Sequence, residues 1–467
     1  MIVKKNEKKN TALKVSCLII IIAVTAVFFF GCAVRPKAKN DIFDTKTVHR
    51  IDVSISKEDW DDLLTHPIDK TKYKADLSID GEKISNVSFA TKGSTSLFLA
   101  ANDPENRRYS FKINFGHFEK GQTWHGSKKL NLQSSFADAT YMKDYLSYWL
   151  FREMDVPAPQ TGYVWITING EDQGLYLAVE EIDKKFMDRE SLTGGSLYKP
   201  EDESDPEADK AGMPVNSSGA DLVYTDDDIN NYDGIFADAI VEKDPGGRSK
   251  VIKSLKGIRD LQNLEDCLDT EEISRYFAVH NFVCNYDSYI GPKSHNFDLY
   301  ERDGKLKMLP WDYNLAFGAF PSDGQFGHVS DSTWVVNQGI DTPLICVTED
   351  KRPMWRWIVS DEKYLDLYHK DVDRLLADCF ESGAFEKKID ETYEMILPYV
   401  EKDPTAYYSP EDFKKAYSTL KKLCSLRAKS IRKQLDDGLS TRTDEQEEAE
   451  KIDASDLLIK DMGIIEE

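Results

Sequence analysis

The chain has 467 residues, which is enough for one large domain or two modest ones. Its 83 acidic residues outnumber its 60 basic residues, and the net charge of −23 argues against a nucleic-acid-binding protein, which needs a basic surface. The seven cysteines have neither CxxC nor Cys/His metal spacing, so no zinc site or disulfide scaffold is predicted. A single disulfide is left as an alternative.

The first 31 residues read as a bacterial export signal. A lysine-rich start is followed by an apolar run, residues 15–30, that ends at Gly31-Cys32. We expect cleavage before Cys32 and lipid attachment there, with residues 32–46 as a tether. The alternative is a retained membrane anchor, for which the run falls short of about 20 residues. Both interpretations predict an extracytoplasmic protein held at the bacterial cell membrane.

Residues 47–115 are predicted to form strands and a short helix. Alternating apolar and polar residues predict strands over 48–56, 73–79, 87–92 and 109–115, and residues 57–65 a helix. The small residues from Gly93 and Ser94 to Ser96 separate the last two strands, as in a hairpin that covers a nucleotide. Backbone N–H groups at Gly93 and Ser94 could bind phosphate and Lys112 could pair with it, unless Lys112 faces solvent.

The middle and the end of the chain supply further hairpins and most of the helices. The pattern predicts an amphipathic helix over 139–154 and a hairpin over 164–179 that ends at Glu180. An acidic insertion or loop follows at 200–250. Helices are expected over 250–264, 271–284 and much of 361–436, and then an acidic tail, 437–467, that is disordered or ends in a short helix.

Residues 295–318 carry the strongest functional pattern. Asn296 precedes a strand, an Asp303-Gly304 turn and a second strand, which ends at Trp311-Asp312. Asp287 lies upstream in a loop. This order of Asp, Asn, hairpin and Asp is the order in which a protein kinase presents its catalytic and metal-binding residues, with Asp287 orienting the hydroxyl and Asp312 and Asn296 sharing Mg²⁺.

The kinase signature itself is absent, since neither HRD nor DFG occurs at these positions. An ordinary hairpin with surface acids is therefore the alternative. Trp311 suggests the rim of a pocket, and the acids of the hairpin itself are assigned to solvent, namely Asp298, Glu301 and Asp303.

A family resemblance extends this interpretation. PWDYNLAFG, residues 310–318, resembles the PWDxDxxFG element of the spore-coat protein H (CotH) family of atypical protein kinases, and residues 128–159 and 161–186 are similar to two further family segments. The resemblance implies Asp287 as the catalytic carboxylate and Asp312 as a metal ligand supported by Asn296. Asn314 replaces the second Asp but keeps a carbonyl oxygen. Glu180 would bind lysine or metal, or else be an exposed acid at the start of a helix.

The implied protein has an α+β, atypical protein-kinase-like fold with antiparallel hairpins and a helical C-terminal part, over residues 47–436. It would use ATP with Mg²⁺ or Mn²⁺ to phosphorylate Ser or Thr of a protein. Because the chain is acidic, we expect a basic, Ser-rich substrate. Two alternatives stay open. One is a catalytically inactive surface binding protein or adhesin, and the other is a metal-dependent hydrolase or nucleotidyltransferase.

Overall fold

The computed structural model describes residues 41–465, apart from 104–105, 202–218 and 321–330. Residues 42–467 form one compact unit. The predicted leader, Cys32 and most of the tether lie outside the described residues, so the lipoprotein prediction stays a prediction. Within the described ranges, no helix combines the length and the apolar character needed to cross a membrane.

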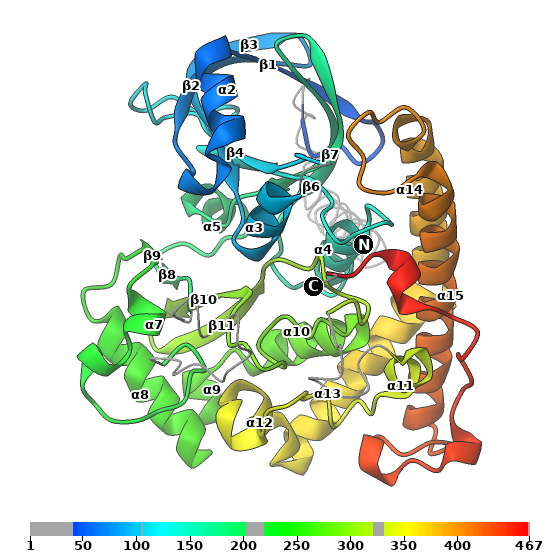
Figure 1. The fold of residues 1–467 in the computed structure, drawn as a ribbon. Coiled ribbons are helices and arrows are strands. Elements are labelled where there is room, and N and C mark those ends of the chain that lie inside the picture. The colour runs from blue at the N-terminus through cyan, green and yellow to red at the C-terminus, as the bar shows by residue number, and fades with distance from the viewer. Residues whose placement is uncertain (1–40, 104–105, 202–218, 321–330, 466–467) are drawn as a thin grey trace, which may run out of the picture. The chain divides into compact units, whose positions relative to one another are not determined.

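Seven strands close into a barrel in the first half of this unit (Figure 1). Only β1 and β6 run parallel; the other neighbours are antiparallel. Alternate apolar side chains point inward and form one core, in which Phe89, Phe111 and Tyr176 pack together. In pairing order the strands are β1 (His49–Ile55), β2 (Tyr73–Ile79), β3 (Glu82–Lys92), β4 (Ser110–Asn114), β5 (Lys129–Gln133), β7 (Glu171–Glu180) and β6 (Thr161–Ile168).

Several local predictions are confirmed in this barrel. The predicted strand over 73–79 is β2, and the predicted helix over 57–65 is α2 (Lys57–Thr65), which Ser56 caps by accepting a hydrogen bond from the Asp59 N–H. The connection around Gly93 differs from the predicted hairpin turn. β3 and β4 do pair, but helix α3 (Thr95–Asn102) stands between them in place of a tight turn.

The second half of the unit contains a four-stranded sheet and most of the helices. The sheet has the order β11-β10-β8-β9, with β8 (Ser196–Tyr198), β9 (Ala239–Val241), β10 (Phe297–Arg302) and β11 (Lys305–Pro310). The helices that follow the barrel strand β5 are α4 (Lys143–Glu153), α5 (Lys184–Arg189), α7 (Asp233–Phe236), α8 (Gly247–Asp260), α9 (Leu264–Cys267), α10 (Thr270–Val283), α11 (Ser332–Asn337), α12 (Pro353–Val359), α13 (Glu362–Leu375), α14 (Ala384–Val400) and α15 (Pro410–Leu435). The α+β prediction is thus confirmed, and the closed barrel is an addition to it.

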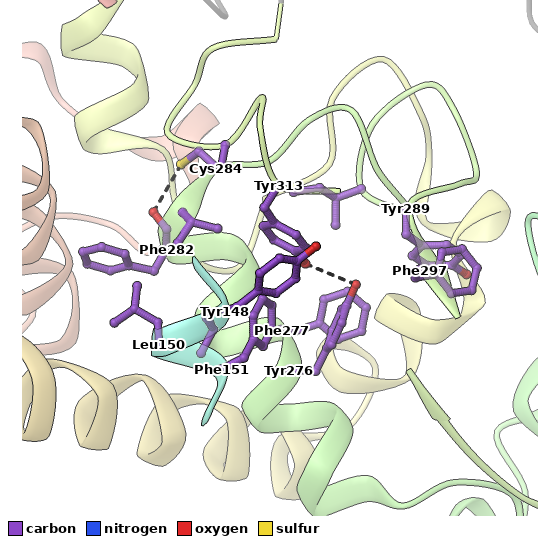
Figure 2. Packing of buried hydrophobic residues seen from close by; sticks show 14 of the residues in the cluster. Tyr148, Leu150, Phe151, Tyr276, Phe277, Phe282, Cys284, Tyr289, Phe297 and Tyr313 are labelled. Carbon is purple, nitrogen blue, oxygen red and sulfur yellow. Dashed lines mark hydrogen bonds between the residues drawn. The ribbon is translucent and has the colours of Figure 1, made fainter. Parts of the chain in front are cut away.

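An aromatic core lies beneath the β10–β11 hairpin (Figure 2). It joins α4 to α10, because Phe151 packs against both Tyr276 and Tyr313 with ring centroids 5.4 and 5.2 Å apart. His280 is buried in the same core, 2.6 Å from the Tyr313 hydroxyl through Nδ1 and 2.9 Å from Ser288 Oγ through Nε2. No disulfide joins the described cysteines.

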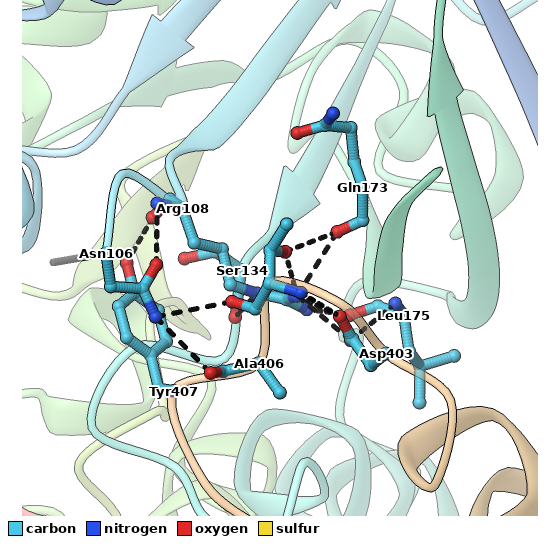
Figure 3. Close-up of polar contacts among 9 residues, drawn as sticks. Asn106, Arg108, Ser134, Gln173, Leu175, Asp403, Ala406 and Tyr407 are labelled. Atoms are coloured by element: carbon cyan, nitrogen blue, oxygen red, sulfur yellow. Dashed lines mark hydrogen bonds and ion pairs between the residues drawn. The ribbon is translucent and has the colours of Figure 1, made fainter. Parts of the chain in front are cut away.

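A buried ion pair ties the barrel to the segment between α14 and α15 (Figure 3). Arg108 donates to both carboxylate oxygens of Asp403 at 2.9 Å, and neither side chain is exposed. The same carboxylate accepts the Leu175 N–H, while Arg108 Nε donates to the Ser134 carbonyl at 2.8 Å. This network fixes where the barrel lies against the C-terminal helices.

The segment after α15 is ordered and has a short helix near its end, at Ile459–Met462, which confirms one of its two predicted alternatives. Residues 437–465 pack against the rest of the unit, and the Ala139 N–H donates to the Met462 carbonyl at 3.0 Å. The predicted alternative of a disordered tail is therefore wrong for these residues. Apolar side chains spaced along an otherwise acidic segment are what bury it, namely Leu439, Ala454, Leu457, Ile459 and Met462.

Candidate functional site

A cavity of about 1040 Å³ lies between the barrel and the β10–β11 hairpin. It is large enough for a nucleotide, since ligand pockets commonly span roughly 300–1,000 Å³. The residues predicted for the site converge on it, with one exception. The predicted residues that line it are Gly93, Ser94, Lys112, Asp287, Asn296, Trp311, Asp312 and Asn314.

Asp287 is held in a tight loop after α10. The helix ends at Cys284, whose φ of +47° turns the chain away from the helix axis. Gly291 makes the loop compact, because a Cβ there would lie 1.8 Å from the Tyr286 carbonyl oxygen. The loop therefore presents the Asp287 carboxylate from a rigid base.

Two neighbours orient the Asp287 carboxylate. His295 Nε2 lies 2.8 Å from Oδ1, and Asn296 Nδ2 donates to Oδ2 at 3.2 Å and to the Asp287 carbonyl at 2.6 Å. Burial raises the pKa of Asp287, but His295, Lys293 and Asn296 together outweigh this and hold that pKa below its ordinary value. Asp287 is therefore an ionised carboxylate with a fixed orientation.

Asp312 follows β11 and is positioned by helix α4. Its N–H donates to the Tyr148 hydroxyl at 2.9 Å, and the next N–H, of Tyr313, donates to Asp144 Oδ1 at 2.7 Å. The Asn285 amide also donates to the Asp312 carbonyl at 3.3 Å. These bonds support the positive φ of 56° at Asp312, a conformation that non-glycine residues seldom adopt.

Buried acids and a lysine form the electrostatic centre of the cavity. Burial raises the pKa of Asp312, Lys92 opposes this rise and Asp287 adds to it. Burial and the nearby Asp312 raise the pKa of Asp144 to about 8, and burial lowers the pKa of Lys92 against the attraction of Asp312. Lys92 thus lies among buried acids whose pKa values are raised, which is a setting that favours an additional cation.

The turn after β3 offers phosphate-binding groups on the opposite wall. Gly93 has a φ of +111°, and Ser94, Thr95 and Ser96 line the cavity at the N-terminus of α3. The first N–H groups of a helix have no partner within it and attract anions. Lys92 Nζ lies 5.9 Å from the centre of the Trp311 ring, so the lysine stands between the turn and the hairpin.

Lys112 pairs with Glu181, and the predicted role of Glu180 is corrected here. Lys112 Nζ lies 2.8 Å from Glu181 Oε1, and Asn131 donates to Oε2 at 2.7 Å. Burial raises the pKa of Glu181, but Lys112 and Lys129 outweigh this and lower it to about 2.

Glu180 does not line the cavity, because alternate residues of β7 point to opposite sides. Its carboxylate instead binds Arg189 at 2.6 Å.

Two acids of the hairpin are buried, although they were predicted to face solvent. Asp298 is 2% exposed and lines the cavity, and Glu301 is fully buried outside it. Burial raises the pKa of Asp298 to about 8. Only Asp303, at the turn, is exposed as expected.

Residue types alone did not identify five members of the site. They are Lys92, Asp144, Glu181, His295 and Asp298. His295 and Glu181 are sequence neighbours of predicted residues, and Asp298 has the same strand parity as Asn296, so alternation could have indicated it. Lys92 directly precedes the predicted Gly93, whereas Asp144 comes from a segment far from the hairpin in sequence and no local pattern marks it.

A metal ion would have few protein ligands here. Among the described residues, no group of three or more His, Cys, Asp or Glu is arranged to hold one. Mg²⁺ in phosphotransferases usually takes one or two carboxylates and completes its shell with phosphate and water. Asp312 with the amide oxygens of Asn296 and Asn314 fits that donor set.

Comparisons with known proteins agree with this geometry. A family model described as CotH kinase protein matches residues 90–431. The chain is 23% identical over 351 residues to inner spore coat protein H of Bacillus subtilis (strain 168), covering 73% of this chain and 88% of that protein. It is also 32% identical over 92 residues to the inner spore coat protein H-like protein of the same organism, covering 20% and 28% of the two chains.

Proposed function

Because the chain belongs to the CotH kinase protein family, we propose that it is an atypical protein kinase with a kinase-like fold. It would transfer the γ-phosphate of ATP to Ser or Thr hydroxyls of a protein on the outer side of the bacterial cell membrane. The observation that carries the proposal is the convergence of Asp287, Asp312, Lys92 and Lys112 on one cavity. The membrane tether at Cys32 is part of the proposal and rests on the sequence of the leader.

Asp287 is the proposed catalytic carboxylate. It orients the hydroxyl of the protein substrate and takes its proton as the hydroxyl oxygen bonds to the γ-phosphorus and the bond from that phosphorus to ADP breaks. His295 and Asn296 fix the carboxylate, and its lowered pKa keeps it unprotonated at neutral pH. The product hydroxyl carries the phosphate, and ADP leaves.

The remaining residues bind and orient ATP with Mg²⁺ or Mn²⁺. Asp312, Asn296 and Asn314 would hold the metal, which when bound neutralises charge on the phosphates. Lys92, Lys112 and the N–H groups at Gly93 and Ser94 face the same space and supply positive charge for the phosphates. Trp311 supplies an aromatic wall.

A phosphate-transfer assay tests the proposal. The full-length chain is incubated with γ-labelled ATP, Mg²⁺ or Mn²⁺ and a lysine-rich, serine-containing protein. We expect label on the acceptor, and a loss of at least about 100-fold in Asp287→Asn and Asp312→Asn, because the first removes the proton acceptor for the substrate hydroxyl and the second removes the charged ligand of the metal. Asp303→Asn, an exposed acid of the same hairpin, is the matched control and should keep full activity.

The assay also separates the alternative functions. Transfer of AMP in place of phosphate, read by mass spectrometry, would identify a nucleotidyltransferase. Binding of ATP without any transfer would point to an inactive relative, for which Asn314 in place of a second Asp is the relevant change, or to a different acceptor protein.

A further inference from the structure

Asp298 has a buried carboxyl oxygen without a protein partner. The residue lies on β10, two positions after Asn296, and is 2% exposed. Its Oδ1 has no hydrogen-bond partner among the described residues, although the side chain lines the cavity. Buried polar atoms in native proteins are nearly always satisfied, and because Asp298 lines the cavity this oxygen is available to a donor on a ligand.

The charged neighbours of Asp298 are already engaged with other groups. Glu181 takes the ammonium of Lys112 at 2.8 Å and that of Lys129 at 3.2 Å. Lys199 pairs with Glu201. These pairings leave Asp298 outside the ion-pair network that surrounds it.

Apolar side chains line the cavity near Asp298 in addition to its charged neighbours. Asp298 lies opposite Leu309 in the hairpin register, and Trp311 is two residues further along on the same face. Trp311, Ile182 and Leu177 all line the cavity with Asp298. An acceptor among apolar walls suits a planar group that carries N–H donors on its edge.

The distance along β10 indicates which part of a nucleotide reaches Asp298. Asn296 is at the phosphate end, beside Asp287, to which it donates. Asp298 is roughly 7 Å further along the strand, since a strand rises about 3.3 Å per residue. The part of ATP remote from the transferred phosphate is the base.

We propose that Asp298 recognises the base of ATP, an inference that rests on the proposed nucleotide site. Its free Oδ1 accepts a hydrogen bond from the 6-amino group of adenine, while Trp311 and Ile182 lie against the ring. Asp298 is then a specificity-determining residue, and a purine without an amino group at position 6 leaves the oxygen unsatisfied.

Binding of two nucleotides to the full-length chain with Mg²⁺, measured by calorimetry, tests this proposal. The probes are ATP and purine riboside triphosphate, which is ATP with hydrogen in place of the 6-amino group. We expect the wild type to bind ATP about tenfold more tightly, the size of one hydrogen bond to a buried group. Asp298→Leu should bind both equally, and Asp298→Asn, whose amide oxygen can accept the same bond, should keep most of the preference.

Glu301→Gln is the matched control, because Glu301 is an equally buried acid of β10 that does not line the cavity. It should leave the ratio unchanged. Equal affinities in the wild type, or an undiminished preference in Asp298→Leu, would overturn the role of Asp298, and the wild-type comparison decides even if the leucine variant fails to fold. If neither nucleotide binds, the proposed nucleotide site itself is wrong.

Discussion

Glu181 and Glu180 are adjacent acids that the structure sends to different environments. Glu181 faces Lys112 in the cavity, and Glu180 faces Arg189 beneath it. The Lys112–Glu181 pair fixes an ammonium group on a cavity wall that would otherwise be free to move. In the proposed kinase, this ammonium faces the phosphates of ATP.

We expect Glu181→Gln to weaken ATP binding by about tenfold, because the Lys112 ammonium loses its charge-assisted hydrogen bond and its orientation. Calorimetric titration with ATP and Mg²⁺ measures the effect. Glu180→Gln is the matched control, and it should lower the thermal stability without changing the affinity for ATP. The reverse result would assign the cavity role to Glu180.

His280 makes the stability of the protein depend on pH. Burial lowers its pKa to about 3, so it stays neutral in the folded chain while the unfolded chain takes up a proton near pH 6.5. The unfolded state therefore binds more protons, and the contribution of His280 to stability is lost as the pH falls from about 6.5 toward 3.

We expect the difference in unfolding free energy between the wild type and His280→Gln to shrink by about 2 kcal/mol between pH 7.5 and pH 5. Urea unfolding at the two pH values measures this difference. The glutamine variant loses hydrogen bonds at both pH values. Only the change of the free-energy difference with pH therefore reports the protonation of His280. A difference that stays constant would show that His280 is protonated in the folded state.

At the scale of elements, the Arg108–Asp403 pair joins the barrel to the α14–α15 connection. Gly174 makes room for it, since a Cβ there would lie 1.9 Å from Asp403 Oδ1. Removing one partner of a buried pair leaves an uncompensated charge, which costs more than the pair contributes.

We expect Asp403→Ala to lower the free energy of unfolding by about 3–5 kcal/mol, because Arg108 and the Leu175 N–H both lose their acceptor. Denaturant unfolding measures the loss. Asp61→Ala, which removes an exposed ion pair with Lys57 on α2, is the control and should cost less than about 0.5 kcal/mol. Equal losses in the two variants would mean that Asp403 is not buried as described.

At the scale of the whole molecule, the last described segment completes the unit. Lys143 is fully buried, and its ammonium donates to the Gly463 carbonyl at 2.6 Å and to the Ala137 carbonyl at 2.8 Å. Burial lowers the pKa of Lys143 to about 8. Ile465 reaches the wall of the cavity itself.

We expect deletion of residues 453–467 to lower the free energy of unfolding by a few kcal/mol, because four buried apolar side chains lose their contacts and Lys143 loses an acceptor. Thermal unfolding measures the change. Lys460→Ala, an exposed position in the same segment, should have little effect. An unchanged melting temperature after the deletion would contradict the observed packing.

Local sequence patterns were sufficient for much of the fold and for the centre of the site. Alternation predicts β2, residues 57–65 are predicted as the helix that is α2, and the Asp303-Gly304 turn predicts the β10–β11 hairpin with Asn296 and Asp312 at its open end. These features depend on backbone preferences and on neighbours within a few residues. Such features can therefore be predicted from a single sequence.

By itself the sequence determined the α+β composition, the order of Asp287, Asn296 and Asp312, and the resemblance to a kinase family. Only the tertiary structure decided the barrel closure through β1 and β6, the choice of Glu181 over Glu180, the entry of Asp144 into the cavity, and the packing of the last segment. The physical reason is separation along the chain. Burial and pairing between distant segments depend on the packing of the whole core, which no local pattern encodes.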